Sequence, residues 1–296
     1  SYKDRKIIDF KNNNLHLVGY SKPIKKTVTK NELFKHLYTD KNNKNAIPYV
    51  TSYYKKNWGF CVSDNFKKKI KGEKFKVFID SSFNKKGSLT FGEALIKGNN
   101  KKEILISCNI CHPSMANNEL SGPALLAFLG EFISKRKNYY TYRILFLPET
   151  IGTISYLYNN LKKIKRNFVA GFHLTCIGDG GKFSMIKTKY GNSYSDKMAK
   201  KVIEKKNNKI YSFLECGSDE RQYNYPGINL PVVTLCRSKF GEFKEYHSSM
   251  DNLKFVSPKS LADSFDFLIN LINELENDSN DFKIYSTTKC EPFMSK

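Results

Sequence analysis

From about residue 100 onward, short apolar runs alternate with longer amphipathic stretches. The runs are rich in β-branched and aromatic residues, which predicts strands at residues 103–108, 142–147, 168–176 and 231–236. The amphipathic stretches predict helices at about residues 121–136, 151–164, 193–206 and 258–276. Ser257-Pro258 supplies an N-cap and a first-turn proline for the last helix. This alternation predicts an α/β domain with a mixed, largely parallel sheet covered by helices on both faces.

Residues 1–99 follow a different pattern, with short β-type segments and few amphipathic stretches. A short helix is expected at residues 30–36, and aromatic and β-branched clusters predict strands at residues 47–54, 58–62, 75–80 and 88–96. The Tyr and Trp residues of these clusters either form the core of a small β domain or line a substrate cleft. A polar tract at residues 97–102 marks the predicted boundary. The predicted organisation is therefore a β-rich domain (1–99), an α/β domain (100–276) and an irregular tail (277–296).

The charge of the chain is strongly positive. Fifty Lys and Arg residues against 28 Asp and Glu residues give a formal net charge of +22. Such a field attracts polyanions. The basic residues are mostly lysines spread from end to end, with no arginine-rich stripe and no nucleic-acid-binding motif. Nucleic acid is therefore not an expected partner. A protein that binds polyanions through its lysines is kept as a separate hypothesis.

Cysteine usage and hydropathy indicate a reducing compartment. The seven cysteines are scattered, and several lie inside apolar runs, which predicts free thiols and no disulfide framework. Cys108 and Cys111 form a C-x-x-C pair, but no second pair completes a structural zinc site. No apolar run approaches the ~20 residues that cross a bilayer. A cytoplasmic protein without membrane contact is expected, and its oligomeric state is left open.

Polar residues gather where the predicted strands end. In parallel sheets the carboxyl ends of the strands are the usual place for chemistry. His112 and Glu149 each follow a strand, residues 217–222 form a compact charged loop, and His247 lies in a polar loop before the last helix. Each of these residues could also have a purely structural role. A Glu at a helix start, for example, stabilises the helix by about 0.5 kcal/mol. Their convergence on one sheet edge favours a single site, whereas His173, in the middle of a strand, is expected to be a core residue.

Four segments carry a family resemblance. Residues 112–122 resemble the His…Asp-Asp-x-x-Ser-Gly segment of the co-catalytic zinc aminopeptidase superfamily, which includes the glutaminyl cyclases. Three further segments are similar to its Glu-Glu-x-Gly, Ser-Asp-His and His-x-x-x-Asp motifs, and these are residues 148–152, 217–220 and 245–252. The chain is more similar still to a bacterial aminopeptidase-like family with a small inserted β-rich domain. Members of that family extend further at both ends, so the chain is expected to be a fragment of a longer protein.

The resemblance implies a role for each matching residue. His112 and His247 would be metal ligands, and Glu149 would be the general base. The implied activity is zinc-dependent hydrolysis of an amide or peptide bond near a free terminus, with a peptide or small amide as substrate. The implied substrate-binding residues are Asp219, Glu220, Arg221 and Tyr246.

Three positions depart from the superfamily pattern. Asn118 replaces the bridging Asp, and a neutral amide cannot substitute for a carboxylate between two cations. Thr150 replaces the second Glu, and Thr175 replaces the strand Asp of the other metal. The adjacent Glu119 is not expected to compensate, because neighbouring side chains usually point apart. The expectation is one weakly bound zinc ion, with Asn118 at a ligand position. The alternative is a catalytically impaired relative that binds a peptide or amino-sugar ligand in the same cleft.

Overall fold

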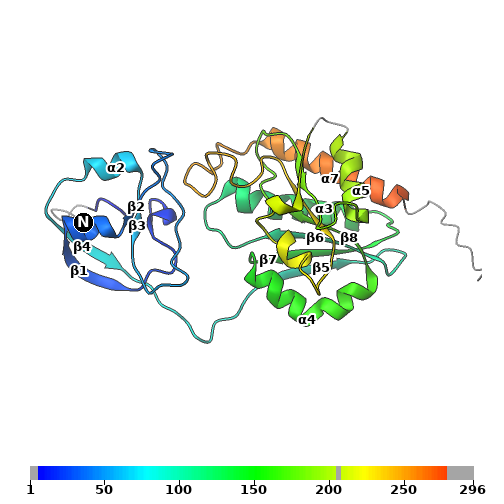
Figure 1. Cartoon of the computed structure of the whole chain (residues 1–296), viewed down its shortest axis with the longest axis horizontal. Coiled ribbons are helices and arrows are strands. Elements are labelled where there is room, and N and C mark those ends of the chain that lie inside the picture. The colour runs from blue at the N-terminus through cyan, green and yellow to red at the C-terminus, as the bar shows by residue number, and fades with distance from the viewer. Residues whose placement is uncertain (1–5, 205–207, 279–296) are drawn as a thin grey trace, which may run out of the picture.

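The computed structural model describes residues 6–204 and 208–278. Its elements form two lobes joined by an extended segment (Figure 1). In the smaller, β-rich lobe, β1 pairs antiparallel with β4, and β2 pairs parallel with β3. The elements of this lobe are η1 (Asn14–His16), β1 (Ile24–Thr29), α1 (Lys30–Lys35), β2 (Leu37–Tyr38), β3 (Phe60–Cys61), α2 (Asp64–Lys69) and β4 (Lys74–Ile79).

The small lobe has a core of its own. Residues of β4 alternate between exposed and buried, and the buried ones pack around Leu33 and Trp58. The prediction of a strand at residues 47–54 is wrong. This segment is a loop with isolated bridges at Pro48 and Thr51. Pro48 has no N–H to give to a ladder, and it pairs with Ser248 of the other lobe.

The large lobe is built on a seven-stranded sheet in the order β10-β9-β11-β8-β6-β7-β5. Its four central strands are parallel, whereas β5 runs antiparallel to β7 and β9 antiparallel to β11. This confirms the predicted mixed, largely parallel sheet. The strands are β5 (Gly92–Ile96), β6 (Glu103–Asn109), β7 (Thr141–Leu147), β8 (Phe168–Leu174), β9 (Ser184–Ile186), β10 (Lys209–Tyr211) and β11 (Val232–Cys236).

Helices cover both faces of the large sheet (Figure 1). On one face lie α3 (Ser121–Ser134), α5 (Tyr194–Ile203) and α7 (Pro258–Asp278). On the other lie α4 (Ile151–Asn167) and the short α6 (Glu220–Tyr223), with the 3-10 turn η4 (Phe213–Glu215) just before it. All four predicted helices are present. Within the described ranges, no helix is both long and apolar enough to span a membrane.

The first strand of the large lobe, β5, begins at Gly92, which is before the predicted domain boundary at residue 99. β5 pairs with β7 of the large sheet, and the polar tract at residues 97–102 is the turn that leads from β5 into β6. A turn and a linker have the same composition, so the tract could not distinguish them. At the other end α7 runs through Asp278, two residues into the predicted tail. The rest of that tail, residues 279–296, lies outside the described residues.

Gly98, in the turn after β5, allows a prediction about stability. A Cβ at this position would overlap the carbonyl group of Tyr140. The turn would have to move, so Gly98→Ala should lower the free energy of unfolding by about 1–3 kcal/mol. Gly180→Ala is the control, because its Cβ would meet only Ser260 Oγ at 3.9 Å and should change stability by less than about 0.5 kcal/mol. Urea unfolding measures both variants, and equal effects would contradict the prediction.

Candidate active site

His112 lies beyond the carboxyl end of β6, and the carboxylate of Glu119 contacts its imidazole ring. Its Nδ1 is 2.7 Å from Glu119 Oε1, and Glu119 Oε2 accepts a hydrogen bond from the Cys111 amide at 3.0 Å. Glu119 belongs to the π-helical turn η2 (Ala116–Leu120), an irregularity often found at functional sites. A carboxylate on one ring nitrogen orients the imidazole and frees the other nitrogen for a ligand. Glu119 is therefore a supporting residue, a role that the sequence did not reveal.

The charge of His112 depends on the same contacts. Burial opposes protonation, but hydrogen bonds to Cys111 and Glu119, together with the negative charge of Glu119, outweigh it and raise the pKa of His112 to about 11. A metal ion needs a neutral imidazole and competes with this proton. Metal affinity at His112 should therefore fall as the pH falls.

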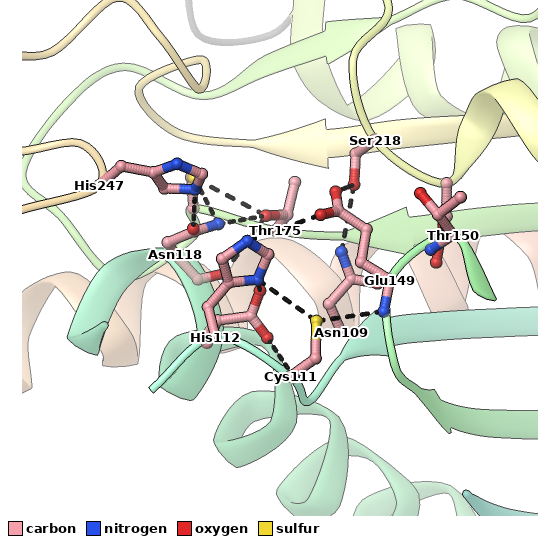
Figure 2. A network of polar contacts seen from close by, with 12 residues as sticks. Asn109, Cys111, His112, Asn118, Glu149, Thr150, Thr175, Ser218 and His247 are labelled. Atoms are coloured by element: carbon pink, nitrogen blue, oxygen red, sulfur yellow. Dashed lines mark hydrogen bonds and ion pairs between the residues drawn. The ribbon is translucent and has the colours of Figure 1, made fainter. Parts of the chain in front are cut away.

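His247 faces His112 from the loop that precedes α7. The two ring centroids are 4.9 Å apart, and His247 Nε2 is 3.0 Å from Asn118 Oδ1 (Figure 2). Asn118 is fixed through its backbone amide, which donates to Asp251 Oδ2 at 3.0 Å. Burial, with the nearby charge of His112, lowers the pKa of His247 to about 4. His247 is therefore neutral at neutral pH, as a metal ligand must be.

Glu149 stands at the carboxyl end of β7, next to these imidazoles. Its Oε1 accepts a hydrogen bond from Ser218 Oγ at 2.9 Å, and its Oε2 is 3.8 Å from His112 Nε2 (Figure 2). Burial raises the pKa of Glu149, while the charge of His112 and the hydrogen bond from Ser218 oppose the rise. The next residue, Thr150, has φ +62, a strained value for a β-branched residue. The turn that presents Glu149 thus stores strain, as functional turns often do.

Two of the predicted substrate-binding residues hold this turn and its neighbouring loop together instead. Asp219 is 1% exposed, and its carboxylate accepts hydrogen bonds from the Thr150 amide (2.7 Å) and Thr153 Oγ1 (2.6 Å). Burial raises the pKa of Asp219 to about 7. Glu220 is fully buried and accepts hydrogen bonds from the Ser218 amide and Thr234 Oγ1. Neither carboxylate is free to bind substrate, because protein donors already occupy both.

The other two lie at the edge of the site. Arg221 is exposed, and its Nε donates to the Ser218 carbonyl at 3.0 Å. Tyr246 stacks on His247 with ring centroids 3.9 Å apart, so it supports that imidazole. The structure thus brings together His112, Asn118, Glu149 and His247. Tyr246 contacts His247, and Arg221 contacts Ser218.

The small lobe contributes a residue that the sequence did not place at the site. The Tyr49 ring lies 5.2 Å from the His112 ring and 5.4 Å from the His247 ring, centroid to centroid. Its backbone amide donates to the His247 carbonyl at 2.8 Å, and the Ser249 amide donates to the Ile47 carbonyl at 2.9 Å. The aromatic richness of residues 47–54 was the available signal for this contact.

The donor atoms of this site fit one zinc ion. His112 Nε2, His247 Nε2 and Asn118 Oδ1 are nitrogen and oxygen donors of the kind zinc accepts. The 3.0 Å between His247 Nε2 and Asn118 Oδ1 is close to the separation of two ligands bound at about 2.0 Å in a tetrahedral site. Donor atoms of Cys111, His112 and Glu119 also lie within 4.8 Å of one another. On that side His112 Nδ1 already contacts Cys111 and Glu119, so Nε2 is the ring nitrogen that could hold a metal ion.

The sheet order and the covering helices are those of an aminopeptidase-like α/β fold. The solved structure of BSAP, a zinc aminopeptidase from Bacillus subtilis, superimposes with a TM-score of 0.62 at 10% identity, over 83% of this chain and 65% of that one. An identity this low shows the fold alone, and the fold agrees with the resemblance read from the motifs.

A family model and relatives at higher sequence identity show which family the chain belongs to. The chain belongs to the family described as Domain of unknown function (DUF4910), whose model matches residues 16–278. It is 45% identical to a Clostridium acetobutylicum protein, provisionally named a polysaccharide biosynthesis protein with aminopeptidase-like domain, over 99% of this chain and 67% of that protein. A Clostridium acetobutylicum crystal structure, provisionally called a peptidase, matches with a TM-score of 0.90 at 44% identity, over 98% of this chain and 68% of that chain.

Proposed function

We propose that this chain is a zinc-dependent, aminopeptidase-like hydrolase that cleaves an amide or peptide bond near a free terminus. The observation that carries the proposal is the meeting of His112, Glu149 and His247 from three separate segments at one edge of the parallel sheet. Glu149 Oε2 lies 3.8 Å from His112 Nε2, and the two imidazole rings are 4.9 Å apart. The zinc aminopeptidase among the fold neighbours supports the choice of metal.

Each residue has a defined part in this proposal. His112 and His247, with Asn118, would hold one zinc ion. Bound zinc supplies a water of lowered pKa and polarises the scissile carbonyl. Glu149 takes the proton of the attacking water at Oε2 and returns it to the leaving amine. Ser218 occupies Oε1, so the free carboxylate oxygen is the one on the side of His112.

Asn118 favours a second candidate, a catalytically impaired relative. Its Oδ1 is within hydrogen-bond distance of His247 Nε2, so the two side chains satisfy one another without a metal ion. Such a protein would bind a peptide or amino-sugar ligand in the same cleft. The provisional name of the Clostridium acetobutylicum relative, which refers to polysaccharide biosynthesis, supports an amino-sugar ligand.

Elemental metal analysis of the purified protein separates these candidates. The hydrolase should carry about one zinc ion per chain, and His112→Ala should carry much less. His16→Ala is the control, because His16 lies in the small lobe on the Cys61 carbonyl. Absence of metal from all three proteins would favour the impaired relative. Polyanion binding that collapses with salt and survives His112→Ala would favour the lysine-driven alternative.

A further inference from the structure

A buried polar chain runs behind Glu149, away from the metal ligands. His173 lies in β8, directly opposite Ser107 of β6, and its ring is fully buried. Its Nδ1 is 3.0 Å from Ser107 Oγ, and its Nε2 is 3.2 Å from Ser218 Oγ. Ser218 Oγ in turn donates to Glu149 Oε1 at 2.9 Å. A continuous line of hydrogen bonds therefore joins the middle of the sheet to the proposed base.

Ser218 is the branch point of this chain, and it has one proton to give. Asn109 Nδ2 donates to Ser218 Oγ at 3.2 Å, and the Ser218 proton goes to Glu149 (Figure 2). The remaining partner, His173 Nε2, must then be a donor as well, because the second lone pair of the hydroxyl is the only position left. Two donors pointing at one hydroxyl leave its proton a single direction, toward the carboxylate.

The environment of His173 is consistent with this assignment. Burial lowers the pKa of His173 to about 4, so the ring is neutral at neutral pH and carries one N–H. With that N–H on Nε2, Nδ1 accepts from Ser107 Oγ. The charged group that faces the ring is Glu220, whose carboxylate is occupied by the Ser218 amide and Thr234 Oγ1. Both ring nitrogens have serine partners, which offset the cost of burying the polar ring.

We propose that His173 is a positioning residue for Glu149: by donating to Ser218, it directs the serine proton onto Glu149 Oε1 and so keeps Oε2 turned toward His112. The inference rests on the proposed role of Glu149 as the base. It differs from the interpretation of His173 as a core residue, because it requires one particular tautomer and an effect on the carboxylate.

The tautomer can be measured without any activity. Nitrogen-15 NMR of histidine-labelled protein, with the His173 signals assigned from their loss in His173→Gln, should show a neutral ring protonated at Nε2 between about pH 5 and 8. A ring protonated at Nδ1 would overturn the proposal, because Ser218 would then have to give its proton to His173.

The effect on Glu149 is a second, independent measurement. Carbon-13 titration of the side-chain carboxyls, with Glu149 assigned by Glu149→Gln, should show a higher pKa for this group in Ser218→Ala, which has lost a donor to the charged form. His173→Phe should raise it less, and His173→Gln should restore it, since the amide can donate to Ser218 and accept from Ser107. His112, Glu119 and Arg221 also act on Glu149 and are unchanged in all three variants. An unshifted Glu149 in Ser218→Ala would overturn the proposal.

Kinetics then link the network to the reaction. Ser218→Ala should lower kcat/KM at neutral pH by about tenfold to a hundredfold, the value of a hydrogen bond to a charged group, and move the acid limb of its pH profile upward. His173→Gln should keep the wild-type profile. If the wild-type protein hydrolyses nothing, the proposed function fails, while the two NMR measurements still decide the hydrogen-bond assignment. If His173→Phe does not fold, the Glu149 titration in Ser218→Ala and the NMR measurement of the His173 tautomer still test the proposal.

Discussion

Glu149→Gln is expected to abolish hydrolysis while leaving the fold intact. The amide keeps the shape of the carboxylate and still accepts the Ser218 hydrogen bond at Oε1. It cannot take a proton from water, so turnover should fall by about a hundredfold to ten-thousandfold, the usual contribution of a general base. The measurement is turnover of aminoacyl amides, together with the thermal unfolding midpoint.

The control for this variant is Glu131→Gln. Glu131 is an exposed residue of α3 paired with Lys135, so its loss should change neither turnover nor the midpoint by much. Unchanged turnover in Glu149→Gln would remove Glu149 as the base. A large drop in its unfolding midpoint would instead show that the carboxylate is needed for the fold.

Asn118→Asp is expected to raise zinc affinity strongly. The Asn118 side chain already faces His247, with Oδ1 3.0 Å from Nε2, so the substitution introduces a charge with little change of shape. Loss of a residue that only supports a ligand commonly costs 10–100-fold in metal affinity. A direct anionic ligand should matter at least as much, so the gain should be about tenfold to a hundredfold or more. Competition with a chromophoric chelator measures it.

The gain should depend on His247. In the His247→Ala background, Asn118→Asp should give much less improvement, because the shared ion has lost its second imidazole. An equal gain in both backgrounds would mean that the new carboxylate binds zinc elsewhere. No gain in either would remove position 118 from the ligand set and favour the impaired relative.

The α/β core could be predicted because its signals are local. The strand and helix periods of residues 103–176 and 231–276 are strong, and the observed elements begin and end within a few residues of the predicted ones. β9 and β10 were not predicted, since three residues are too few to show a period. The loop at residues 47–54 was misassigned because it pairs with Gly19 at one end and, at the other, with residues about 200 positions away, and composition carries no such information.

The site was predictable to the extent that it depends on topology. Strand ends in a parallel sheet share one edge, so the positions of His112 and Glu149 after their strands are enough to predict that the two lie together. Orientation was not predictable. Asp219 and Glu220 lie in the expected loop, but short charged side chains compete for nearby backbone amides, and here those amides hold them. His173 was expected to be a satisfied core residue, and both its nitrogens do have partners, but those partners lead to Glu149.

The Tyr49 contact has a mechanical consequence. Hinge opening between the two lobes would break the main-chain bonds that join Ile47 and Tyr49 to residues 247 and 249. It would also withdraw an aromatic ring from both imidazoles at once. Separation of the lobes and loss of the ring contacts at His112 and His247 are thus energetically coupled. A ligand that spans both should clamp the molecule shut, and by reciprocity a closed molecule should bind that ligand more tightly.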